Sequence, residues 1–404
     1  FKHSGGGVSS WIHETINPKF AYYAGWTYWA CHVTYIASKG SGGLKALSWM
    51  VFQNGTTYDK FPTIWVQLAT LAVLLFFCWV ASRGLNPLKK LATIAGTSMF
   101  VMSILYILMM FAAPVINPNG GYISMDFSMK NLIPQFNLGY FTSLSILVFA
   151  VGGCEKISPY VNKMKNPSKD FSKGMITLAI MVTVCAVLGT IALGMMFDSN
   201  NIPEDLMTNG AYYAFQTLGE YYHVGDFFVV VYAITNLIGQ FAVLILSIDA
   251  PLRMLLDSAD ERYIPKALFK QNKYGTYTNG HKMVTVIVSI LIVVPAFGIE
   301  SVDVLVKWLV KVNSVCMPLR YLWVFAAYIA LKKAGDKFHA EYRFVKNKTV
   351  GIVFGVWCFA FTAIACILGI YSEDTFQLVL NIVTPFVLIG LGFIMPVIAK
   401  RTNK

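Results

Sequence analysis

The sequence predicts an all-α polytopic membrane protein, and three observations support that fold class. The chain of 404 residues is 56% hydrophobic and only 13% charged, whereas a soluble domain carries about 25% charged residues. Its mean hydropathy is +0.58. Its apolar residues also cluster into blocks of roughly 20, the length of a membrane-spanning helix. Backbone groups in lipid must bond internally and the alternation of a β-barrel is absent, so the blocks are predicted to be helices.

About ten such blocks follow one another along the chain. They cover residues 18–38, 62–83, 91–113, 139–160, 174–197, 226–250, 283–299, 302–331, 349–371 and 376–399. A large soluble helical core is the alternative, and the low charge content disfavours it. We therefore expect a single transmembrane domain over residues 1–404.

The positive charges predict the orientation. If the termini and every second connection share one side, that side holds 25 of the 32 Lys and Arg residues. Lys39, Lys45, Lys60 and Lys130 are assigned to the opposite connections. An excess of Lys and Arg marks the cytoplasmic face, so both termini are expected to be cytoplasmic. The net charge of +12 then reflects contact with the lipid bilayer, and no basic groove with interleaved aromatics suggests nucleic acid.

No motif in the sequence supports an enzyme or a metalloprotein. There is no phosphate-binding glycine loop, no H-E-x-x-H and no G-x-S-x-G. His and Cys residues do not occur at metal-ligand spacing. We expect no catalytic residues, no metal and no cofactor.

The stretch "VFAVGGCEKISPYVNKMKNPSKD", residues 148–170, interrupts a predicted span. Gly152 and Gly153 weaken a helix by roughly 1 kcal/mol each relative to alanine. Glu155 follows at once, and an ionisable residue within a span is a candidate functional residue. A broken helix is tolerated where its freed backbone groups are buried in protein or line a cavity. Alternatively, the span ends near Gly153, with Glu155 at the interface and Lys156 extending toward water.

This stretch resembles the sixth-helix signature of the amino acid–polyamine–organocation (APC) superfamily. The matching elements are Phe149, Gly153-Cys154-Glu155 and Asn166-Pro167-Ser168-Lys169-Asp170. Within the superfamily it is most similar to the glutamate/γ-aminobutyrate antiporter family. The segments 248–280, "IDAPLRMLLDSADERYIPKALFKQNKYGTYTNG", and "SGGGVSSWI…NPKFAYYAGWTYW" near the start resemble that family too.

The resemblance implies the LeuT-like transporter fold of twelve helices, the first ten forming two inverted five-helix repeats. The ten blocks then match helices 3–12. Because the chain starts at Phe1 and not at a methionine, we expect an N-terminally truncated protein that lacks helix 1 and most of helix 2.

The resemblance also implies that substrate is held at the broken helix around residues 152–158. Gly152, Gly153, Cys154 and Glu155 are the expected substrate-binding residues there, with Glu155 tuning the site. Phe149 occupies the position of the family's aromatic gate, although ordinary packing is its alternative role.

Two further pairs of polar residues are candidate substrate contacts. Asn236 and Gln240 are four apart and share a helix face, so they contact either substrate or a neighbouring helix. Lys307 and Lys311 share a face of the 302–331 block. They either attract an acidic substrate to an outer vestibule, or Lys307 extends to the surface while Lys311 pairs with a carboxylate.

The function implied is secondary active transport of amino acids, as an exchanger of glutamate/γ-aminobutyrate-type substrates. Block 91–113 contains no lysine, unlike many proton-coupled members, which favours exchange. The alternatives are a permease coupled to protons and a transporter-like amino acid sensor. Lys156, Lys163 and Lys165 depart from a family run that is usually more acidic. The expected location is the plasma membrane, specifically a bacterial inner membrane.

Overall fold

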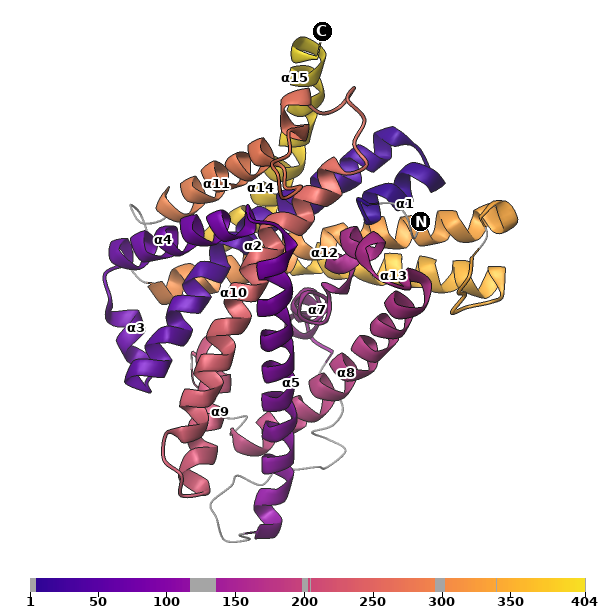
Figure 1. The fold of residues 1–404 in the computed structure, drawn as a ribbon. Helices are drawn as coiled ribbons and strands as arrows, with labels where there is room; N and C mark the ends of the chain where they lie inside the picture. Colours follow the sequence, from indigo (N-terminus) through magenta and orange to yellow (C-terminus); the bar gives the residue numbers. More distant parts are fainter. Residues whose placement is uncertain are drawn as a thin grey trace.

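The computed structural model describes residues 5–116, 136–197, 203, 205–294, 302–338 and 340–403. Figure 1 shows a bundle of long helices, and no β-strand occurs in the described ranges. The first half contains α1 (Val8–Thr15), α2 (Pro18–Phe52), α3 (Thr56–Lys60), α4 (Thr63–Ala81), α5 (Leu85–Ile116), α7 (Leu138–Val151), the 3₁₀ segment η1 (Cys154–Lys163) and α8 (Pro167–Met196).

The second half continues in the same way. It contains α9 (Leu206–Tyr221), α10 (Phe227–Leu256), η2 (Lys266–Phe269), α11 (Thr278–Val293), α12 (Val302–Ala334), η4 (Gly335–Lys337), α13 (Lys348–Gly369), α14 (Thr375–Gly390), η5 (Leu391–Phe393) and α15 (Ile394–Thr402).

The predicted spans coincide with these helices. Among the described residues, eight helical segments are long and apolar enough to cross a membrane. The two other predicted spans correspond to α2 and to the shorter apolar helix α11, whose predicted end at 295–299 lies outside the described residues. The last predicted span is divided, because η5 separates α14 from α15. The predicted all-α polytopic membrane fold is confirmed.

The boundary predicted for the first span was wrong. The helix α2 begins at Pro18, where the Asn17 side chain accepts a hydrogen bond from Phe20 N (2.9 Å), and it continues to Phe52 rather than ending near residue 38. Lys39 and Lys45, assigned to a connection, lie inside it. Hydropathy does not predict the second half of α2, because other helices cover it. Its small and polar residues contact protein instead of lipid.

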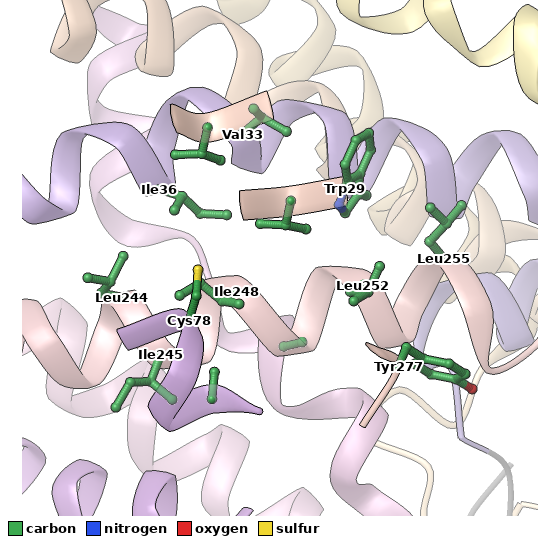
Figure 2. Close-up of a cluster of buried hydrophobic side chains, with 14 of the residues drawn as sticks. Trp29, Val33, Ile36, Cys78, Leu244, Ile245, Ile248, Leu252, Leu255 and Tyr277 are labelled. Atoms are coloured by element: carbon green, nitrogen blue, oxygen red, sulfur yellow. The ribbon is translucent and has the colours of Figure 1, made fainter. Parts of the chain in front are cut away.

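The largest buried cluster lies where α2 and α10 pack against each other (Figure 2). Trp29 and Val33 of α2 meet Ile248 and Leu252 of α10, and α4 and α11 add side chains at the edge. Gly25 allows the close approach, since an added Cβ would lie 2.8 Å from the carbonyl oxygen of Met254. These two helices form the support on which the candidate site is built.

Candidate functional site

The predicted helix break is present between α7 and η1. The helix α7 ends at Val151, Gly152 is extended (φ −87°, ψ 175°), and Gly153 adopts φ 113°. That positive φ favours glycine. A Cβ on Gly152 would overlap the ring and hydroxyl of Tyr321 in α12. Both glycines are thus required locally, one by backbone conformation and the other by the approach of α12.

Glu155 is buried in η1, directly after the break. Its side chain is 6% exposed. The Tyr28 hydroxyl of α2 donates a hydrogen bond to Glu155 Oε1 (2.6 Å), and Arg320 Nε of α12 lies 3.3 Å from the same oxygen. Glu155 is therefore enclosed by protein side chains, and its place within the membrane stays a prediction.

Arg320 is the most buried cation of this site, at 1% exposure. Its Nη2 donates to the Tyr321 hydroxyl (2.8 Å), and its Nη1 lies against the imidazole of His32. His32 Nδ1 is 2.8 Å from the carbonyl oxygen of Tyr28. A neutral His32 with its proton on Nδ1 satisfies both contacts. The Arg320 side chain thereby connects α12, α2 and the broken helix.

Lys156 is a second buried cation beside the break. It is 6% exposed, its Nζ donates to Ser247 Oγ of α10 (3.3 Å), and it lies 4.3 Å from the centre of the Tyr35 ring. Lys39 of α2 approaches the same ring at 4.6 Å. The alternative that Lys156 extends toward water is wrong. Inside the bundle, the hydrogen bond to Ser247 and the electron-rich face of the Tyr35 ring stabilise its ammonium group.

A separate polar network holds the far part of η1. Asp249 of α10 accepts hydrogen bonds from the Tyr160 hydroxyl (2.7 Å) and from Arg253 Nε (2.7 Å), and it lies 3.2 Å from His281 Nε2 of α11. Asp249 and Arg253 thus form an ion pair four residues apart on α10, and tertiary packing extends it to η1 and α11.

Two further predicted site residues, Phe149 and Cys154, lie at the break. The Phe149 ring packs edge-on against Tyr35, with ring centres 6.0 Å apart. It therefore lies beside the ring that Lys156 and Lys39 approach. Cys154 begins η1 with an exposed side chain. Both therefore lie at the break, as the sequence indicated, and their contact with substrate stays a prediction.

Asn236 and Gln240 lie elsewhere on α10. Asn236 Nδ2 donates to the Tyr212 hydroxyl of α9 (2.8 Å), and Gln240 Nε2 donates to Asn236 Oδ1 (3.0 Å). Asn236 precedes Ser247 by 11 residues, about 16 Å along the helix. The Asn236–Tyr212 contact is the interhelical one considered from the sequence, whereas the Gln240–Asn236 bond lies within α10. The structure does not bring the pair to the break.

Lys307 and Lys311 occupy the first part of α12. Lys307 is half-buried and Lys311 is exposed. Lys311 lines a cavity of about 490 Å³ between α7, α12, α13 and α14, together with Glu373 and Asp374. It lies nine residues before Arg320, about 13 Å along the helix, so it belongs to this cavity and not to the break.

Tyr28, His32 and Arg320 were not singled out as site residues from the sequence. A signal was present, because Tyr28, His32, Tyr35 and Lys39 recur every three or four residues along α2 and so share one face. A polar and aromatic stripe in an otherwise apolar span marks a helix face that looks inward.

A bundle of membrane-spanning helices interrupted at a buried, charged centre defines the class of multi-pass membrane transporters. Residues 2–394 match the model of the amino acid permease family. The chain belongs to this family, and with it to the APC superfamily.

Curated relatives agree with this membership. The aspartate/glutamate permease AcaP of Lactococcus lactis subsp. cremoris (strain MG1363) is 50% identical, over 100% of this chain and 85% of the relative. The inner membrane transporter YjeM of Escherichia coli (strain K12) is 21% identical, over 83% and 71%. The probable agmatine/putrescine antiporter AguD of Lactococcus lactis subsp. lactis (strain IL1403) is 22% identical, over 81% and 67%. The protein is an amino acid transporter.

Proposed function

We propose that this transporter carries acidic amino acids, aspartate and glutamate, and holds them at the break between α7 and η1. The observation that carries the proposal is the charge around the break. Arg320 and Lys156 are both buried there and Lys39 is close by. Among the described residues, Glu155 is the one carboxylate that forms an ion pair with any of these three cations, and its partner is Arg320. A substrate with a second carboxylate would balance this positive excess. The 50% identical relative AcaP is an aspartate/glutamate permease, which supports the same substrate class.

The roles at the site follow from the contacts. The freed backbone groups at Gly152 and Gly153 would bind the α-carboxylate and α-amino groups. Lys156 and Lys39, whose ammonium groups lie 4.3 Å and 4.6 Å from the centre of the Tyr35 ring, would face the side-chain carboxylate. Glu155 would hold Arg320 in place until substrate binds. Phe149, which packs against Tyr35, would close over the substrate.

We further propose that transport proceeds by exchange, with both termini in the cytoplasm of a bacterial cell. The helix α5 offers no lysine over residues 91–113, whereas many proton-coupled members of the superfamily carry one in the corresponding helix. The asymmetry of Lys and Arg between the two sides supports the orientation.

Counterflow in proteoliposomes tests the proposal. Vesicles containing the full natural protein are preloaded with glutamate, aspartate, γ-aminobutyrate, leucine or buffer, and uptake of labelled glutamate is followed at neutral and acidic pH. Acceleration by internal glutamate and aspartate, but not by leucine, is the expected result. Equal uptake into empty vesicles driven by a pH gradient would instead establish a proton-coupled permease. Saturable binding without flux would establish a sensor.

A further inference from the structure

The connection between α12 and α13 forms a basic cavity at one edge of the bundle. Figure 1 shows the two helices side by side, joined at that edge. The cavity has a volume of about 470 Å³, and four cations line it: Lys332, Arg343, Lys346 and Lys348. None of its described lining residues is acidic. It belongs to neither the break nor the cavity that contains Lys311.

One of these cations is held in a fixed position. The Lys332 stem lies against Gly351 of α13, where an added Cβ would be 2.8 Å from its Cε. Its Nζ donates a hydrogen bond to the carbonyl oxygen of Val345. The ammonium group is therefore oriented before any ligand arrives, which lowers the cost of binding an anion.

The start of α13 adds to the positive potential. Asn347 caps this helix of 22 residues by accepting a hydrogen bond from Val350 N (3.0 Å). The N-terminal end of a helix carries a partial positive charge. Lys348 is the first residue of the helix, so side-chain charge and helix dipole act at the same place.

Exposed aromatic side chains border the cations. Phe344 is 79% exposed, Tyr342 is also exposed, and both line the cavity. The adjoining α12 and α13 are both candidate membrane spans that end here. Aromatic rings and Lys or Arg side chains at the end of a span are typical of the membrane–water boundary. A ligand with a negative headgroup and an apolar tail satisfies both parts of the surface.

We propose that this cavity binds the headgroup of an anionic phospholipid, with Phe344 and Tyr342 contacting its acyl chains. A free phosphate ion would use the cations but leave the aromatic rim in water. A bilayer is always present beside a membrane-spanning helix, and basic pockets between spans bind anionic lipid headgroups. This site is independent of the substrate proposed above.

Native mass spectrometry of the delipidated full-length protein tests the site, with phosphatidylglycerol as the probe and phosphatidylcholine as the neutral lipid. The double variant Lys346→Gln/Lys348→Gln is compared with Lys400→Gln/Arg401→Gln, which removes two exposed charges from the end of α15. We expect one tightly retained phosphatidylglycerol, about tenfold weaker retention in the first variant, and wild-type retention in the second.

Inorganic phosphate at equal phosphate concentration should not displace the lipid. Equal losses in the two double variants would overturn the proposal, because the attraction would then be unspecific. Displacement by inorganic phosphate, or equal retention of phosphatidylcholine, would overturn it as well. Melting temperatures of both variants establish that each is folded.

Discussion

Arg320, Lys156 and Glu155 bring two positive charges and one negative charge into the interior of the helix bundle. Each buried ion has partners: Tyr28 and Arg320 for Glu155, Tyr321 and His32 for Arg320, and Ser247 for Lys156. Removing an ion from water costs several kcal/mol, which contacts of this kind offset in part. The positive excess that remains is the feature on which acidic-substrate selectivity depends.

Lys156→Met should weaken recognition of acidic substrates selectively. Losing a charge that faces the substrate carboxylate should raise KM for glutamate at least about tenfold, equivalent to about 1.4 kcal/mol, while the maximal rate is retained. Initial rates in proteoliposomes measure both. Lys163→Met, at the exposed last residue of η1, is the matched control and should resemble the wild type. A fall in the maximal rate with an unchanged KM would contradict a role in substrate recognition.

Glu155→Gln should destabilise the protein by leaving Arg320 without its negative partner. Breaking one side of a buried ion pair costs about 3–5 kcal/mol, so the melting temperature in detergent should fall clearly. The double variant Glu155→Gln/Arg320→Gln should recover part of that loss, since neither charge is then buried alone. If the double variant lost as much as the two single variants summed, the pair would not be coupled.

At the scale of the element, the break between α7 and η1 depends on two neighbouring glycines with different roles. Gly153 supplies a positive φ, and Gly152 supplies the space that Tyr321 of α12 occupies. The backbone groups freed here are the ones that a substrate would use. The network around Asp249 then holds η1 against α10 and α11.

Gly152→Ala should impair transport by forcing Tyr321 and α12 away from the break. The added Cβ overlaps the Tyr321 side chain, and overpacking of this kind costs about 1–3 kcal/mol. We expect a large loss of initial rate together with a lower melting temperature. Gly189→Ala in α8 is the control, because nothing lies within 4 Å of its added Cβ. Wild-type transport by Gly152→Ala would show that this contact is dispensable.

At the scale of the whole molecule, the basic connections share one side of the bundle if the spans alternate. The turn at 222–226, between α9 and α10, is assigned to the other side. Lys39 and Lys45 belong to α2 and not to a connection. Fewer cations are therefore left on the side assigned to the exterior, which strengthens the charge asymmetry that orients membrane proteins.

An epitope inserted after Ala340 should be hidden from antibody in intact cells and accessible after permeabilisation. An epitope inserted after Val224, in the exposed turn, should be accessible in both. The positive-inside asymmetry is the physical reason. Transport by each insertion variant serves as the folding control. The opposite accessibility would reverse the orientation.

The amino-acid sequence by itself determined the class, the approximate spans and the place of the break. Span length, low charge and adjacent glycines are local properties that lipid imposes directly on the chain. It did not determine the second half of α2. A helix surrounded by protein does not need the continuous apolar surface that a lipid-facing span requires.

Only the tertiary structure decided which polar residues meet. Arg320 contacts His32, which lies 288 residues away in the chain, and Glu155 contacts Tyr28, 127 residues away. Asn236 and Lys311, equally polar in sequence, lie outside this cluster. The physical reason is that a polar side chain in a span lowers its free energy through whichever partner helix packing brings near. That packing is a property of the whole bundle, whereas the break is a property of two adjacent residues.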